Sequence, residues 1–140
     1  MNQTAILWPM IAHVLLIYLI YLLISRRRVA AVKAGHAKAS QFRENQDEPA
    51  ESLFVRNNLE NQFELPMLFY PCCLALFVTG GTSFLTVALA WLFVLSRYGH
   101  AFIHVTTNRL RHRYLAFVFG LLTLGVMWSV LALHLTFGIS

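Results

Sequence analysis

Four long apolar stretches, separated by polar segments, dominate the pattern of the chain. They predict membrane-spanning helices at residues 4–25, 57–79, 83–108 and 114–138. The first stretch has no Lys, Arg, Asp or Glu, and it is about as long as the roughly 20 residues that an α-helix needs to cross a bilayer. Gly80, Gly81 and Thr82 predict a tight turn between the second and third stretches.

Charged residues are confined to two windows. All 11 Lys and Arg lie within residues 26–56 and 97–113, and all 6 Asp and Glu lie within residues 44–64. Because loops rich in Lys and Arg stay on the cytoplasmic side of a membrane, we expect the basic windows in the cytoplasm. Both termini and the turn at Gly80 are then outside. Three arginines follow the first apolar stretch instead of preceding it, which favours a retained span over a cleaved signal peptide.

Composition narrows the class of protein further. Hydrophobic residues make up 58% of the chain and charged residues only 12%, whereas a soluble domain is about 25% charged. A small soluble bundle is therefore disfavoured. The net charge of +5 does not indicate a nucleic-acid partner, because the bases flank apolar spans. Nothing marks a domain boundary, so we predict one all-α domain over residues 1–140, an integral membrane four-helix bundle.

Two smaller features complete the predicted framework. Cys72 and Cys73 are neighbours that cannot easily reach disulfide geometry with each other, so both are expected in the core. The polar segment at residues 26–55 is predicted to be a solvated loop of mixed charge, compatible with some helix but interrupted by Pro49. Its charged residues near the proline are Arg43, Glu44, Asp47, Glu48 and Glu51.

The second and third spans are short, and polar residues extend both. Their apolar parts hold about 15 and about 13 residues, below the roughly 20 needed to cross a bilayer. Asn57, Asn61 and Glu64 are spaced i, i+4 and i+7, so on a helix they form one polar stripe. Pro66 predicts a kink just after it. Ionisable groups at membrane depth usually face the bundle interior and find partners.

A second polar stripe lies on the third span. Arg97, His100 and His104 are spaced i, i+3 and i+7, and Arg109 and Arg113 share a face if the helix continues. Two interpretations stay open. The stripes are either an interhelix network that pairs acids with bases, or an anion site on the cytoplasmic side in which several arginines surround a polar ligand.

A metal site is a weaker interpretation of the same residues. His100 and His104 have the spacing of a helical ligand pair, which Glu60 or Glu64 would complete. The nearby arginines repel a cation, so no metal site is expected.

The two motif regions resemble the MAPEG family, the membrane-associated proteins of eicosanoid and glutathione metabolism. NQFELPMLFY, residues 61–70, is similar to the Asn-x-x-Glu segment of the family's second helix, especially in bacterial members. RYGHAFIHVTTNRLRHR, residues 97–113, resembles the Arg-x-x-His signature and the spaced arginines of the third helix. The resemblance covers nearly the whole chain and favours a bacterial inner-membrane protein.

The resemblance implies a homotrimer with glutathione, the co-substrate, bound between subunits near the cytoplasmic face. It assigns Arg113 to stabilising the thiolate of glutathione, which is the nucleophile and forms from a thiol with a pKa near about 8.5. It assigns six further residues to binding glutathione: Asn61, Glu64, Arg97, His100, His104 and Arg109.

The chain departs from the family's pattern at three points. His104 stands where a tyrosine that contacts glutathione is usual. The second helix lacks the usual Glu-Arg-x-x-Arg run and offers only Arg56. Asn57 and Glu60 form a second Asn-x-x-Glu, so the alignment is ambiguous by four residues.

These observations lead to one main hypothesis and two rivals. The main one is a membrane-bound glutathione transferase or peroxidase that acts on lipophilic electrophiles from the bilayer. The first rival is a non-catalytic protein of the same fold that binds lipid or serves as a scaffold. The second is a small transporter or channel subunit, which the sparse polar residues in the far halves of the spans disfavour.

Overall fold

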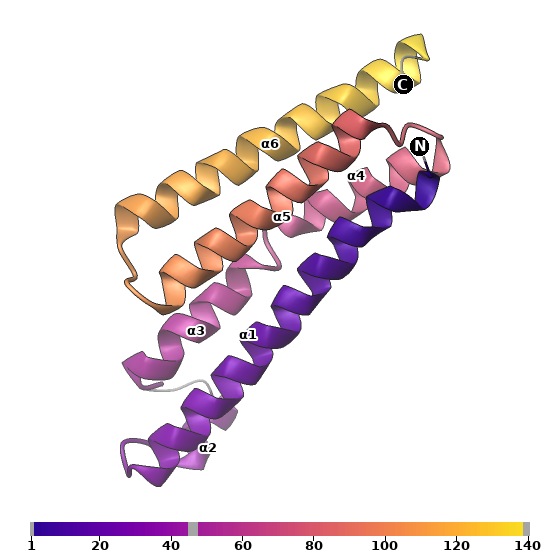
Figure 1. Ribbon diagram of the computed structural model, residues 1–140. Helices are drawn as coiled ribbons and strands as arrows, with labels where there is room; N and C mark the ends of the chain where they lie inside the picture. Colours follow the sequence, from indigo (N-terminus) through magenta and orange to yellow (C-terminus); the bar gives the residue numbers. More distant parts are fainter. Residues whose placement is uncertain (1, 45–47, 139–140) are drawn as a thin grey trace.

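The computed structural model describes residues 2–44 and 48–138. Its elements are η1 (Gln3–Ile6), α1 (Leu7–Lys33), α2 (Ala39–Glu44), α3 (Ala50–Asn61), α4 (Pro66–Val78), α5 (Phe84–Val105) and α6 (Leu110–Phe137). In Figure 1, α3 is followed end to end by α4, and this pair lies in the bundle with α1, α5 and α6. Both chain ends and the α4–α5 turn lie at one end of the bundle, and α2 and the α5–α6 loop lie at the other. The prediction of an all-α four-helix bundle is confirmed.

Within residues 2–44 and 48–138, three segments are long and apolar enough to cross a membrane: Gln3–Lys33, Phe84–Val105 and Leu110–Phe137. Large apolar side chains on their outer faces stay exposed, such as Tyr18 and Leu122, and an apolar surface of this kind suits lipid. The remaining pair is α3 and α4. The 13 residues of α4 extend only about 20 Å, which is too short to cross a bilayer. The second predicted span, residues 57–79, therefore corresponds to the end of α3 together with α4.

The second predicted span is broken, not kinked. α3 ends at Asn61 and α4 begins at Pro66, and the backbone N–H of Gln62 bonds to Leu59 O, three residues back, as in a 3-10 turn. Proline has no N–H to continue α-helical bonding, and it is favoured at the first helical position. Glu64 therefore lies in the break and is exposed, so it does not share a helical stripe with the asparagines of α3.

The predicted loop at residues 26–55 is largely helical. α1 continues to Lys33, α2 follows, and α3 begins directly after Pro49. Pro49 is the N-cap residue of α3 and interrupts no helix, because the first N–H groups of a helix have no intrahelical partner in any case. Asp47 lies outside the described residues, as do the side chains of Arg43, Glu44 and Glu51.

The boundary between α5 and α6 lies earlier in the sequence than predicted. α5 ends at Val105 instead of residue 108, and α6 begins at Leu110 instead of residue 114. Asn108 has a left-handed φ of 48°, a conformation that asparagine tolerates better than most residues. Its N–H bonds to Ile103 O at 2.8 Å and closes the end of α5. The helix therefore does not continue to Arg109, which instead caps α6.

The predicted turn between α4 and α5 is confirmed. Gly80 has a φ of 74°, which glycine adopts without steric cost. Ser83 then starts α5 with a capping box to Thr86. Beside the turn, a Cβ added to Gly81 would lie 2.8 Å from the His134 ring, so the turn packs closely against the end of α6.

Aliphatic, aromatic and cysteine side chains fill the core. Phe69 of α4 and Phe93 of α5 stack with ring centroids 4.5 Å apart. Cys72 and Cys73 are free thiols and fully buried, so their predicted place in the core is confirmed.

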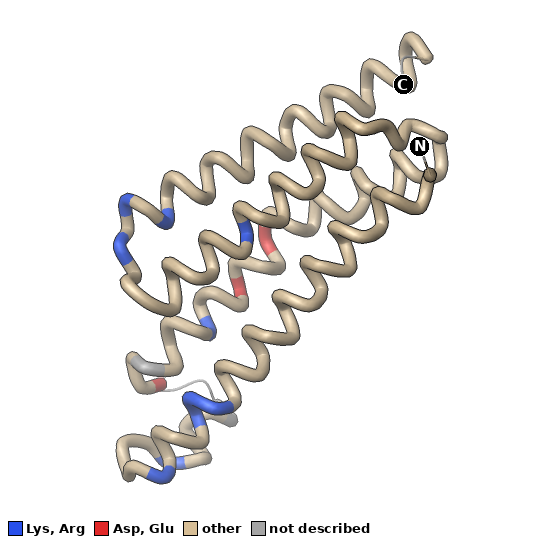
Figure 2. Tube along the Cα trace, viewed as in Figure 1, with Lys and Arg blue, Asp and Glu red and all other residues tan. Residues whose placement is uncertain are grey.

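Charge is confined to one half of the bundle, as Figure 2 shows. The half that contains α2, α3 and the α5–α6 loop holds the Lys, Arg, Asp and Glu residues drawn there. The half with both chain ends and the α4–α5 turn holds none among the described residues. Arg97 is the sole Lys or Arg within α5 (Phe84–Val105).

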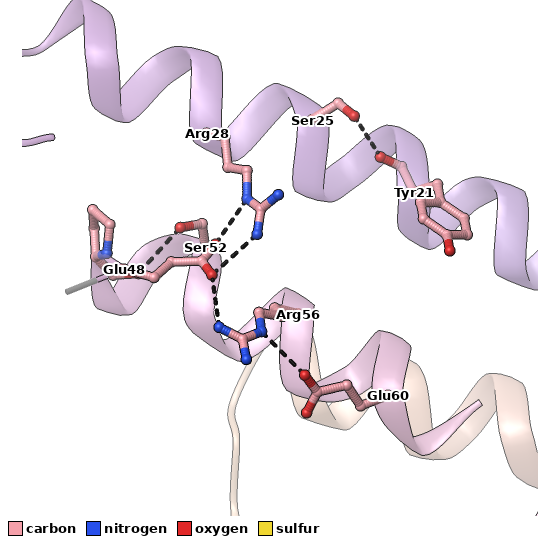
Figure 3. Close-up of polar contacts among 8 residues, drawn as sticks. Tyr21, Ser25, Arg28, Glu48, Ser52, Arg56 and Glu60 are labelled. Carbon is pink, nitrogen blue, oxygen red and sulfur yellow. Dashed lines mark hydrogen bonds and ion pairs between the residues drawn. The ribbon is translucent and has the colours of Figure 1, made fainter. Parts of the chain in front are cut away.

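Glu48 lies in the connection between α1 and α3 and bonds to side chains of both helices (Figure 3). Its carboxylate accepts hydrogen bonds from Arg28 Nε and Nη2 at 2.9 and 3.1 Å, and from Arg56 Nη1 at 3.4 Å. The side chain is 1% exposed, so the predicted solvated loop is wrong at this residue. Burial by itself raises the pKa of a carboxyl, but hydrogen bonds from Arg28, Ser52 and Arg56 hold the pKa of Glu48 below its ordinary value.

Replacing Glu48 with glutamine is expected to destabilise the protein by about 2 kcal/mol, because it leaves two arginines without their shared carboxylate. Glu60→Gln is the matched control, since Glu60 bonds to the same Arg56 but is exposed. The loss of this exposed ion pair should lower the stability by less than about 0.5 kcal/mol. The folded-state pKa of Glu48 is depressed. Its stabilisation is therefore complete above the ordinary glutamate pKa of about 4.3 and is lost as the pH falls through the folded value.

The measurement is the thermal midpoint in detergent from neutral to acidic pH. The difference between wild type and Glu48→Gln should shrink as the pH falls below the ordinary glutamate value. A difference that is constant with pH, or equal effects of Glu48→Gln and Glu60→Gln, would contradict this interpretation.

Candidate functional site

The polar stripe predicted on the third span is present and buried. Arg97, His100 and His104 all lie on α5 and are at most 4% exposed. No hydrogen-bond partner for their side-chain nitrogens exists within residues 2–44 and 48–138. Buried polar groups are normally hydrogen-bonded, so this stripe has donors and acceptors that the described chain does not satisfy.

Arg97 has the largest number of unsatisfied side-chain nitrogens in the stripe. It is fully buried, and none of its three guanidinium nitrogens has an acceptor in the described part of the chain. Its Cζ lies 5.7 Å from the ring centroid of Phe117 and 6.0 Å from that of Phe93, which gives cation–π contact. Ring contacts do not replace a counter-ion for a desolvated charge. The carboxylate of Glu64 attracts Arg97 electrostatically, but the guanidinium nitrogens have no hydrogen bond to it or to any other described residue.

Gly120 allows α6 to approach this part of α5. A Cβ added there would lie 2.7 Å from Ser96 Oγ and 3.9 Å from Arg97 Nε. A side chain at this position would therefore press on the serine and reach the guanidinium. The glycine keeps the packing around Arg97 tight.

A pocket of about 180 Å³ opens beside the stripe, between α3, α5 and α6. Its polar walls are Asn61, His100 and Arg113, and its apolar walls are Leu110, Tyr114 and Phe117. Phe117 links the two features, because its ring lies against both Arg97 and His100. The pocket therefore combines an amide, an imidazole and a guanidinium, with the buried Arg97 behind one wall.

The α5–α6 loop positions Arg113. Its Nη1 donates to Asn108 Oδ1 at 2.7 Å, and Asn108 is the left-handed residue that closes α5. Arg113 Nε is buried and has no partner among the described residues. One side of the guanidinium is thus held by the loop.

The structure brings together some of the predicted site residues and not others. Asn61, His100 and Arg113 line one pocket, and Arg97 lies next to it. His104 is buried with its ring centroid 5.9 Å from that of His100, but it does not line the pocket. Glu64 in the helix break and Arg109 at the cap of α6 are exposed and also lie outside the pocket lining.

Sequence reasoning missed four residues of the site: Asn108, Leu110, Tyr114 and Phe117. Asn108 could have been found, because asparagine before a new run of helix-forming residues is a helix-ending signal. The apolar wall residues gave no signal, since they look like any other membrane-facing position. Within the described part of the chain, no group of three or more His, Cys, Asp or Glu could hold a metal ion.

We compared the chain with known protein families, curated proteins and solved structures. The model of the MAPEG family matches residues 5–133 of the chain. The match includes α1, α3, α4, α5 and most of α6, so every residue of the pocket lies within it. Neither the curated proteins nor the solved structures gave a match.

Proposed function

The chain belongs to the MAPEG family, and from this membership and its buried cations we propose a membrane-bound enzyme that uses glutathione against lipophilic electrophiles. The family includes glutathione-dependent transferases and peroxidases as well as non-catalytic members. The observation that carries the proposal is the fully buried Arg97, which has no acceptor among the described residues beside a pocket lined by Asn61, His100 and Arg113. Such an arrangement fits an anionic ligand better than a wholly internal network.

Glutathione fits this chemistry. It carries two carboxylates, and guanidinium groups bind carboxylates with charge-assisted hydrogen bonds. Asn61 adds an amide for the peptide groups, although its own Nδ2 already donates to Asn57 O. In the proposed arrangement Arg97 neutralises a carboxylate, Asn61 and His100 position the tripeptide, and Glu64, His104 and Arg109 contribute from outside the pocket of one chain.

Arg113 is proposed to stabilise the thiolate. A guanidinium near the sulfur lowers the pKa of the thiol and raises the fraction of the reactive anion. In conjugation the thiolate forms a bond to an electrophilic carbon, and the leaving group departs with its electron pair. In peroxide reduction the same thiolate attacks one oxygen of the peroxide and the O–O bond breaks, which gives the sulfenic acid of glutathione and, after protonation, an alcohol. A second glutathione then converts the sulfenic acid to glutathione disulfide and water. The exposed apolar faces of the helices give such substrates a route from the bilayer.

A homotrimer completes the proposed site. The pocket of one chain, about 180 Å³, is smaller than the roughly 300–1,000 Å³ typical of small-molecule sites. A tripeptide would therefore extend beyond it. We place the rest of the site on a neighbouring subunit, at the cytoplasmic end of the bundle where the basic residues gather.

One observation favours a second candidate function, a non-catalytic member of the family that binds lipid. His104 occupies the position of the usual glutathione-contacting tyrosine, and it is buried outside the pocket lining. On this alternative the pocket is a remnant, and glutathione neither binds nor reacts.

Turnover separates the two functions. Purified wild-type protein in detergent, given glutathione and a chlorodinitrobenzene, is expected to form the thioether with saturation in glutathione. A lipid hydroperoxide in a second arm tests reduction. Asn61→Leu should weaken glutathione binding roughly tenfold through the loss of one polar contact. Absence of turnover in both arms, with no heat on titrating glutathione, would favour the non-catalytic function.

A further inference from the structure

A second hollow lies on the opposite side of α5 from the candidate site. It is an apolar groove of about 200 Å³ where α1, α3 and α5 meet. Leu16 and Ile20 of α1 and Ala101 of α5 are buried within it, while Leu19 and Phe102 at its edges are 48% and 67% exposed. It shares no lining residue with the pocket at Arg113. The groove therefore opens toward the exposed apolar surface of α1 and α5.

A single unsatisfied polar group faces this groove. Asn58 of α3 lines it and is fully buried, yet its Nδ2 has no hydrogen-bond partner in the described chain. The other polar residue of the groove, Tyr98, already donates its hydroxyl to Ala12 O at 2.8 Å. An apolar groove with one unmet amide donor is complementary to an apolar molecule that carries one acceptor.

The hydrogen-bond network around Asn58 fixes which atom of its amide is left unpaired. Gln62 Nε2 donates to the backbone O of Asn58, which can only accept, and also to Asn58 Oδ1, both at 3.2 Å. Asn58 Oδ1 is thus used as an acceptor, and Nδ2 remains. Gln62 Oε1 in turn faces His13 Nε2 at 3.3 Å, and His13 Nδ1 faces Tyr70 Oη at 2.7 Å.

We propose that this groove binds an acyl chain of a membrane phospholipid, with the ester carbonyl accepting a hydrogen bond from Asn58 Nδ2. The carbonyl supplies the acceptor that the amide lacks, and the chain covers the apolar walls. The groove ends at Leu23, close to the arginines of α1 that begin at residue 26. A headgroup phosphate would lie near those arginines. The inference does not depend on glutathione chemistry, because α5 separates the two sites.

Ester and ether phospholipids with the same chains and headgroup test this proposal. Wild-type protein in mild detergent is offered an equal mixture of the two, and bound lipid is counted by native mass spectrometry. Ester lipid should be retained roughly tenfold over ether lipid, the preference that one hydrogen bond gives. Asn58→Leu should bind both equally. The control Asn57→Leu, one residue earlier on α3 and outside the groove, should keep the preference.

Equal retention of both lipids by the wild-type protein would overturn the proposal, and this arm needs no variant. So would an ester preference that survives in Asn58→Leu. If a second copy of the chain covers the groove instead, neither lipid is retained. That result would also overturn the proposal.

Discussion

Replacing Arg97 with methionine is expected to weaken glutathione binding about 100-fold while the protein still folds. Loss of one partner of a desolvated charge pair typically costs about 2–5 kcal/mol, and Arg97 is fully buried with no acceptor in the described part of the chain. Methionine has a similar length and no charge. It therefore fills the space between the rings of Phe93 and Phe117 and leaves the ligand's carboxylate without a partner.

The stability of the ligand-free protein is expected to change in the opposite direction. An unpaired buried charge is unfavourable, and its replacement by an apolar group of similar size is often neutral or stabilising. The thermal midpoint of Arg97→Met without glutathione should therefore match or exceed that of the wild type. The direction of the change in thermal midpoint distinguishes an anion site from an interhelix network, because removal of a paired arginine would lower the midpoint.

Titration calorimetry and thermal unfolding in the same detergent make both measurements. Arg111→Met is the matched control, since Arg111 is an exposed arginine of α6 that does not line the pocket. It should change neither quantity appreciably. Glutathione affinity within twofold of wild type for Arg97→Met, or a large drop in its midpoint, would contradict the assignment.

Replacing Arg113 with alanine is expected to lower turnover about 100-fold and to change glutathione affinity only a few-fold. Removal of one group that stabilises a reacting anion typically reduces kcat by about 10²–10³. The thiol pKa of bound glutathione should rise toward about 8.5. Arg113→Lys should recover part of the activity, because it keeps the charge but loses the planar guanidinium that donates to Asn108.

Ultraviolet absorbance of the thiolate as a function of pH measures the thiol pKa, and initial rates with a chlorodinitrobenzene give turnover. Arg111→Ala removes the same charge from the same helix and should leave both unchanged. Size-exclusion chromatography checks that assembly is intact. Turnover retained by Arg113→Ala would rule out the role proposed for this residue.

The sequence predicted the bundle well, because its apolar lengths and charge windows follow directly from the thickness and low polarity of a bilayer. It also predicted the buried stripe of α5, where spacing alone places Arg97, His100 and His104 on one face. The error at Glu64 arose locally. Pro66 was expected to kink a continuous helix, whereas its missing N–H favours a new helix start and places Glu64 in the break.

The remaining errors have a different cause, which is contact between segments that are distant in the sequence. Glu48 was predicted to be solvated because it lies in a charged segment, yet Arg28 and Arg56 converge on it from two helices, and a linear pattern does not show convergence. The unmet donor of Asn58 was missed for the same reason. It depends on the direction of a network that runs through Gln62, His13 and Tyr70 on separate turns and helices.

A structure determined at saturating glutathione tests the central claim most directly. We expect density for the tripeptide against Asn61, His100 and Arg113, with a carboxylate within hydrogen-bond distance of Arg97 and the sulfur close to Arg113. An empty pocket under conditions where glutathione is present in excess, or glutathione bound elsewhere on the bundle, would contradict it.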